Sequence, residues 1–133
     1  MGRFGIVYHH RSAACRDYAQ LLADHLHLMG HLRHALPVTD ASAHELVYDD
    51  AVVLFSPVTL GRIHGAALVQ AVAPYRPCGV AAVNDGAFPN GVLGLFSLEV
   101  RANSEFFSLP RTTPDRAAVL PVARWLTGLA PAP

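Results

Sequence analysis

Polar side chains follow the first apolar segment of the chain, and their types suit the binding of an anion. The segment Phe4 to Tyr8 is apolar, and His9, His10, Arg11 and Ser12 come directly after it. Hydroxyl, guanidinium and imidazole groups are donors that hold a phosphate or a carboxylate, most effectively at the amino end of a helix. If the apolar segment is a strand, these donors lie in the loop at its carboxyl end, which is a candidate ligand-binding loop.

Two further loops carry residues that could contact a ligand. One follows the apolar run 51–55 and contains Leu60 and His64, and the other follows the run 79–83 and begins with Asn84-Asp85-Gly86. Ligands of parallel sheets bind outside the carboxyl ends of the strands. If the apolar runs are strands of one parallel sheet, all three loops lie at the same edge.

Strands and helices alternate along the chain in a way that predicts such a sheet. Short apolar runs predict strands, and apolar residues spaced three and four apart predict helices. The expected strands are 4–8, 32–38, 51–55, 79–83 and 105–109, and the expected helices are 14–29, 40–46, 63–73 and 115–126. The stretch 92–102 fits either structure. Five strands alternating with helices predict an α/β fold with helices on both faces of the sheet.

Individual residues sharpen several of these boundaries. Ser12 can cap the first helix and Gly30 can end it. Pro37 places the second strand at an edge of the sheet, because proline donates no ladder hydrogen bond. Pro121 requires a kink or a later start in the last helix, and Trp125 is expected to anchor that helix in the core.

Length and composition exclude several classes of protein. The chain has 133 residues, which predicts one domain, 1–129, followed by a frayed tail, 130–133. Ten Arg and no Lys balance ten acidic residues, so no cationic field favours nucleic acid, and lysine-dependent chemistry is excluded. No apolar run approaches the length of a membrane span, and Cys15 and Cys78 form no C-x-x-C motif. These features predict a cytoplasmic protein without a membrane span.

Over nearly its whole length the chain resembles the flavodoxin-like family. The resemblance rests on the strand, loop and helix start of residues 6–19, and on the succession Tyr-Asp, apolar strand and Gly-x-x-His over residues 48–64. The latter pattern resembles the quinone-dependent protoporphyrinogen oxidases of this fold. The short length and the loop 84–88 resemble the small flavodoxins that activate manganese ribonucleotide reductase.

This resemblance implies a five-stranded parallel sheet in a three-layer flavodoxin-like sandwich that binds FMN. His10, Arg11 and Ser12 would hold the phosphate, although the loop is degenerate and Ser12 is the one hydroxyl it keeps. The residues expected at the rest of the cofactor are Leu60, His64 and Phe88 beside the ring, and Asn84 and Gly86 at its polar edge. The chain would then be a small oxidoreductase or electron carrier. Its partner would be a redox protein or a quinone-like small molecule, and a homodimer is compatible with the sequence.

Two other functions remain open on the same fold. The neutral net charge favours a domain that has lost FMN and serves as an interaction subunit or binds another small anion, because electron-transfer flavodoxins are usually strongly acidic. Cys15 in the first helical turn could pair with His9 or His10 as a nucleophile, although packing at the junction is the simpler role. No catalytic residue is identified, so whether the chain is an enzyme stays open.

The remaining chemistry-bearing side chains have simpler explanations. His27, His31 and His34 fall on both sides of an expected helix end, so we predict solvated surface and no metal site there. Asp49, at the start of an expected strand and opposite the ligand edge, is expected to be solvated or to cap backbone groups. Cys78 is expected in the core.

Overall fold

A parallel sheet of five strands in the order β2-β1-β3-β4-β5 organises the protein. The computed structural model describes residues 2–86, 88–112 and 114–129. The strands are β1 (Arg3–Tyr8), β2 (Leu32–Pro37), β3 (Ala51–Pro57), β4 (Cys78–Val83) and β5 (Ser104–Leu109). The helices are α1 (Ala13–Leu28), α2 (Ala43–Leu46), α3 (Ala66–Val72), α4 (Asn90–Leu93), α5 (Leu98–Ala102) and α6 (Arg116–Leu129). This strand order is that of flavodoxin-like folds, so the predicted fold class is confirmed.

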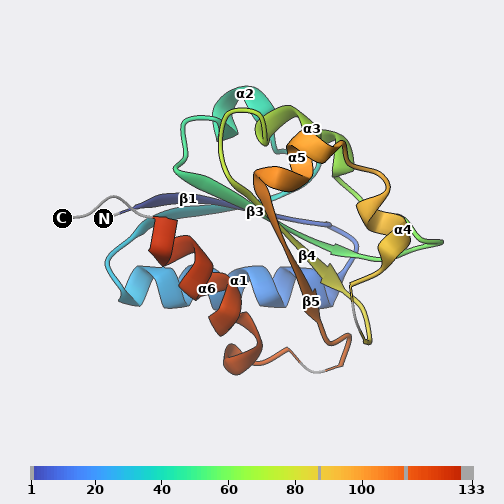
Figure 1. The fold of residues 1–133 in the computed structure, drawn as a ribbon. Coiled ribbons are helices and arrows are strands. Elements are labelled where there is room, and N and C mark those ends of the chain that lie inside the picture. The colour runs from blue at the N-terminus through green and yellow to red at the C-terminus, as the bar shows by residue number, and fades with distance from the viewer. Residues whose placement is uncertain (1, 87, 113, 130–133) are drawn as a thin grey trace.

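The helices lie on both faces of the sheet, as Figure 1 shows. Helices α1 and α6 cover one face, and α2, α3 and α5 cover the other. The longest described helix, α1, has 16 residues, and none in the described ranges combines the length and apolar character needed to cross a membrane. The layering follows from the right-handed crossovers that join parallel strands.

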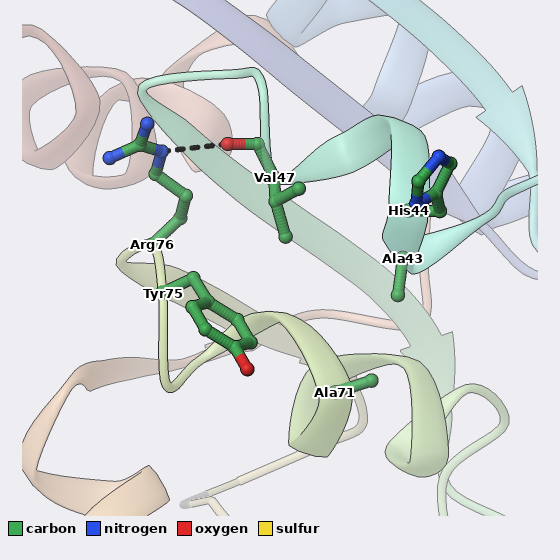
Figure 2. A pocket seen from close by; sticks show the side chains of 6 residues that line it. All are labelled: Ala43, His44, Val47, Ala71, Tyr75 and Arg76. Atoms are coloured by element: carbon green, nitrogen blue, oxygen red, sulfur yellow. Dashed lines mark hydrogen bonds between the residues drawn. The ribbon is translucent and has the colours of Figure 1, made fainter.

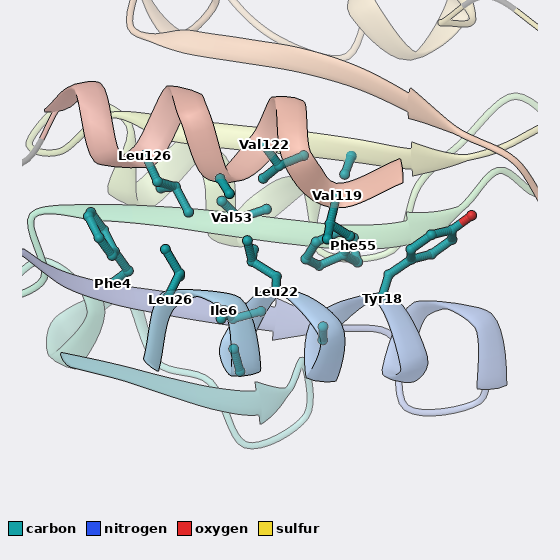
Figure 3. Close-up of a cluster of buried hydrophobic side chains, with 14 of the residues drawn as sticks. Phe4, Ile6, Tyr18, Leu22, Leu26, Val53, Phe55, Val119, Val122 and Leu126 are labelled. Carbon is teal, nitrogen blue, oxygen red and sulfur yellow. The ribbon is translucent and has the colours of Figure 1, made fainter. Parts of the chain in front are cut away.

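The larger core lies between the sheet and the helices α1 and α6 (Figure 3). Alternate residues of β1 and β3 point to this face and meet the apolar stripes of the two helices. The labelled members are Phe4, Ile6, Val53, Phe55, Tyr18, Leu22, Leu26, Val119, Val122 and Leu126. The Tyr18 hydroxyl donates to the Pro110 carbonyl oxygen at 2.7 Å, which satisfies the polar end of this buried ring.

A second core fills the space under α2, α3 and α5. Val7, Val52, Leu54 and Val80 reach it from the sheet, and Cys78 belongs to it, as predicted. Strand β3 is buried on both faces, which explains why its sequence is apolar without interruption.

Most predicted boundaries are confirmed within a few residues. The Ser12 Oγ accepts a hydrogen bond from the Cys15 amide at 3.2 Å, which is the predicted cap of α1, and β2 is an edge strand. The prediction of a helix over 63–73 is wrong at its start, because α3 begins only at Ala66. Gly65 has φ +99°, a left-handed conformation that holds the preceding residues in a loop.

The stretch 92–102, which the sequence left open between helix and strand, falls in two short helices, α4 and α5. Pro121 lies inside α6 on its exposed side, and Trp125 packs on Phe107 with ring centroids 5.9 Å apart. Phe106 contributes to the second core and Phe107 to the first, so this pair occupies opposite faces of β5. The tail 130–133 lies outside the described residues.

Candidate functional site

The strand order reverses between β1 and β3, and folds of this kind bind their ligands outside the carboxyl ends of the strands at that point. Strand β1 leads into α1 on one face, and β3 leads into α3 on the other. The loops 9–12 and 58–65 therefore leave adjacent strands in opposite directions. The His9 amide still donates to the Phe55 carbonyl oxygen at 3.0 Å, so the two loops begin side by side.

The first loop turns tightly into α1. The Ser12 amide donates to the His9 carbonyl oxygen at 3.1 Å, and the Ser12 Oγ accepts from the Cys15 amide. The hydrogen of the Ser12 hydroxyl is not used by this cap and can still be donated to a ligand.

Backbone amides of this loop and of the first helical turn have no partner within the described structure. Amides at a helix start point along the axis and carry partial positive charge, so they attract anions. The first turn of α1 contains no acidic residue that would oppose this attraction. The unpartnered amides are those of His10, Arg11, Ala13 and Ala14.

Cys15 does not occupy this anion site. The side chain is fully buried in the core under α1 and α6, and burial raises the pKa of its thiol to about 11, although hydrogen bonds with the Ser12 side chain and the His9 backbone lower it. A thiol with such a pKa stays protonated near neutrality and is a poor nucleophile. The structure therefore favours the packing role of Cys15 over the nucleophilic one.

The loop after β3 contains a two-residue hairpin. Thr59 and Arg62 exchange both backbone hydrogen bonds, at 2.8 and 3.0 Å, and Leu60 and Gly61 form the turn with φ +52° and +73°. Positive φ at both positions defines a type I′ turn, where leucine is unfavourable by about 1 kcal/mol. Leu60 is nevertheless presented at the tip with 97% of its surface exposed. With so little of its side chain covered, Leu60 gains little packing energy that would offset this strain.

His64 anchors the other end of this loop. Its amide donates to the Oγ of buried Ser56 at 2.8 Å, and its ring stacks on His9 with centroids 3.9 Å apart and planes 15° apart. The stack joins the loop after β3 to the loop after β1. The sequence predicts that His9 lies in a candidate ligand-binding loop but does not predict this stack.

The environment of His9 favours its neutral form. The pKa of His9 is lowered from its ordinary value first by burial, and then by the charges of His64, His10 and Arg11. Its Nδ1 atom is buried and forms no hydrogen bond to a residue that the structure describes. A proton on His9 would place an unpaired charge beside other cationic groups.

The loop after β4 is fixed against β5. The Asn84 amide donates to the Leu109 carbonyl oxygen at 2.8 Å, and the Ser108 hydroxyl donates to the Gly86 carbonyl oxygen at 2.6 Å. The Asn84 side chain has no hydrogen-bond partner in the described ranges, and Gly86 is exposed. Contact of these two residues with a cofactor stays a prediction.

The structure does not pair Phe88 with Leu60 directly. Phe88 packs edge-to-face on Phe106, with centroids 5.1 Å apart, and is partly buried in the second core. A Cβ at Gly91 would lie 3.9 Å from the Gly61 carbonyl oxygen, so it is α4 that lies beside the hairpin. Enclosure of a ring between Leu60 and Phe88 stays a prediction.

Asp49 is a residue whose environment the sequence analysis predicted wrongly. Its carboxylate is fully buried at the opposite edge of the sheet, 3.0 Å from the Arg3 Nε and 2.6 Å from the His34 Nε2. Gly5 makes room for this group, since a Cβ there would lie 2.5 Å from the Asp49 Oδ2. Asp49 therefore ties β1, β2 and β3 together rather than facing solvent.

The histidines near the end of α1 have different roles. His27 is exposed, as predicted, whereas the His31 Nδ1 accepts from the Gly2 amide at 2.9 Å and His34 pairs with Asp49, so the prediction of free surface is wrong for both. Across the described ranges, no group of three or more His, Cys, Asp or Glu side chains has the arrangement of a metal site.

Comparison with solved structures identifies flavodoxins with the same fold. A short-chain flavodoxin associated with a non-canonical PDU bacterial microcompartment aligns with 98% of this chain and 100% of its own, at TM-score 0.74 and 15% identity. The Streptococcus pneumonia TIGR4 flavodoxin aligns with 96% of this chain and 97% of its own, at TM-score 0.69 and 14% identity. Two-electron reduced Megasphaera elsdenii flavodoxin aligns with 84% and 88%, at TM-score 0.68 and 12% identity.

No protein-family model and no curated protein sequence matches the chain. The structural matches show that the protein has a flavodoxin-like fold.

Proposed function

We propose that this protein binds FMN in the crevice between β1 and β3 and acts as a small electron carrier or oxidoreductase. The observation that carries the proposal is the set of unpartnered amides at the start of α1, beside Ser12 and at the point where the strand order reverses. The flavodoxin-like fold supports it, because the crevice is in the place where such folds bind their ligand.

The residues at the start of α1 fit a phosphate group. Ser12 offers a hydroxyl hydrogen, and exposed Arg11 offers a guanidinium that forms charge-assisted bonds. Cys15 is buried in the first core, and Ala13 is exposed and carries only a methyl group. His10, also exposed, can donate to the phosphate when protonated.

Leu60 and the β4 loop fit the flavin ring. Exposed Leu60 supplies an apolar cover for one face, and the Asn84 side chain and the Gly86 backbone supply polar groups for the ring edge. His64, stacked on His9, forms the floor between the two loops. FMN, when bound, takes up and passes on electrons, while the protein orients it and sets its potential.

The electron partner is proposed by class alone. A redox protein or a quinone-like small molecule would exchange electrons with the exposed edge of the ring. The net charge of zero predicts weak electrostatic steering, so the rate of electron transfer should depend little on salt.

Flavin binding can be tested on the purified protein. We expect yellow absorbance from bound flavin, or quenching of FMN fluorescence when FMN is added to flavin-free protein. Arg11→Ala should weaken the binding of FMN more than the binding of riboflavin, because only FMN presents a phosphate. Arg124→Ala, an exposed arginine on α6, is the matched control and should change neither affinity. Equal losses for FMN and riboflavin would remove Arg11 from the phosphate site.

A second candidate function is the binding of a small anion without flavin. Two observations favour it: the first loop keeps one hydroxyl, and the Phe88 ring already packs on Phe106. In that case adding the protein would leave the absorbance and fluorescence of FMN and riboflavin unchanged. Inorganic phosphate would still shift the amide resonances of residues 10–14 in a ¹H–¹⁵N spectrum.

A further inference from the structure

A cavity of about 460 Å³ lies between α2 and α3, away from the proposed flavin site. Val47 and Arg76 stand just before β3 and β4 begin, so this end of the cavity is at the amino edge of the sheet. The loops 9–12 and 58–65 leave the opposite edge. The volume falls within the range of roughly 300–1,000 Å³ that is usual for small-molecule sites.

The walls of the cavity are mainly apolar. Figure 2 shows Ala43 and Val47 on the α2 side, and Ala71 and the ring of Tyr75 on the α3 side; the other two lining residues are His44, on α2, and Arg76. Tyr75 is 71% exposed, so its ring forms a wall and is not part of the core. A flat apolar body would displace water from this groove and contact the tyrosine ring.

A guanidinium stands at one end of the groove, where one hydrogen bond orients it. The Arg76 Nε donates to the Val47 carbonyl oxygen at 2.8 Å, which holds the side chain beside α2 (Figure 2). Its two terminal nitrogen atoms form no hydrogen bond or salt bridge with any residue in the described ranges. Two parallel N–H donors in one plane match the two oxygens of a carboxylate.

From these features we propose that the cavity between α2 and α3 binds a small aromatic carboxylate. The aromatic body lies between Ala43, Val47, Ala71 and Tyr75, and the carboxylate accepts hydrogen bonds from the terminal nitrogens of Arg76. A neutral apolar ligand uses the same walls but leaves the guanidinium without its partner. Because this site and the flavin crevice are at opposite edges of the sheet, the proposal does not depend on flavin binding.

The experiment compares two probes of the same shape and different charge, 2-naphthoate and 2-naphthamide. Titration into the ¹⁵N-labelled protein should shift the amide resonances of Ala43, Val47 and Ala71, with 2-naphthoate binding about tenfold tighter, since hydrogen bonds to charged groups are the stronger ones. Arg76→Gln should abolish this preference and leave 2-naphthamide binding in place, which also shows that the variant is folded.

A second variant tests the contribution of the apolar groove to binding separately from that of the Arg76 charge. Ala71→Trp places a large ring in the groove from an exposed position on α3 and should block both probes, whereas Ala117→Trp on α6 should block neither. The proposal is overturned if 2-naphthoate binds Ala71→Trp as it binds the native chain. It is equally overturned if the native chain binds neither probe, or if Arg76→Gln keeps the preference for the carboxylate. Loss of FMN binding in the earlier experiment would leave these results unchanged.

Discussion

The imidazole rings of His9 and His64 stack face to face, 3.9 Å between centroids, and this contact joins the two loops that leave adjacent strands on opposite faces of the sheet. Stacking of two neutral rings is favourable, whereas two imidazolium ions at this separation would repel each other. The buried, unpartnered Nδ1 of His9 adds a further reason for His9 to stay neutral. We therefore expect the position of both loops to respond to acid through His9.

Acidification should destabilise the protein through His9. The pKa of His9 is lower in the folded chain than its ordinary value near 6.5, so the unfolded chain binds this proton more readily. The contribution to the free energy of unfolding is complete above pH 6.5 and is lost as the pH falls through the folded pKa. Urea unfolding at pH 7.5 and 5.5 should show a smaller loss on acidification for His9→Gln. His27→Gln, at an exposed histidine, should retain the full loss of the native chain.

Two serine caps offer a matched pair for the proposed phosphate site. Ser12 and Ser97 each accept a hydrogen bond from the amide three residues later at 3.2 Å, so Ser12→Ala and Ser97→Ala should each lower the free energy of unfolding by about 1 kcal/mol. Only Ser12→Ala should also weaken the binding of FMN relative to the binding of riboflavin, as measured by fluorescence titration. Equal affinities for FMN in both variants would contradict a phosphate role for Ser12.

The strained turn at Leu60 predicts a trade between stability and binding. Leu60→Asn should raise the free energy of unfolding by about 1 kcal/mol, because asparagine tolerates positive φ and the native side chain packs on almost nothing. The same change should weaken FMN and riboflavin alike, since it removes the cover of the ring. Leu98→Asn, at another exposed leucine, should produce no such gain. Tighter flavin binding by Leu60→Asn would rule out this role of the leucine.

Asp49 should contribute more to stability than its neighbour in sequence. Asp49→Asn removes the carboxylate that pairs with Arg3 and His34 inside the sheet, and should cost about 2 kcal/mol in urea unfolding. Asp50→Asn keeps an oxygen that can accept from the Arg3 amide, and should cost less than about 1 kcal/mol. Similar losses for the two variants would show that the buried ion pairs add little.

The fold could be predicted because its signals are local. Apolar runs such as 51–55 predict buried strands without information from the rest of the chain. The Ser12 cap and the spacing of apolar residues likewise predict the start of α1 to within one residue. The start of α3 was missed because the positive φ of Gly65 and the hairpin before it were not recognised as turn chemistry.

The candidate site could be predicted only in part, for a related reason. The three loops at the carboxyl edge follow from topology, but the partner of each side chain comes from another strand. Nothing near His9 in the sequence indicates that it stacks on His64, and nothing near Phe88 indicates that it packs on Phe106. The pairing of Asp49 with His34 likewise needs β1 and β2 in register.

The two cysteines lie in different cores, Cys15 under α1 and α6 and Cys78 under α2 and α3, and burial raises the pKa of each thiol to about 11 and about 12. In the folded protein both thiols are therefore shielded from alkylating reagents. Each thiol becomes reactive only when the helices that cover it separate from the sheet. Each cysteine therefore reports on the opening of one helical layer. Rates of alkylation at the two sulfurs would time the detachment of each helical layer independently.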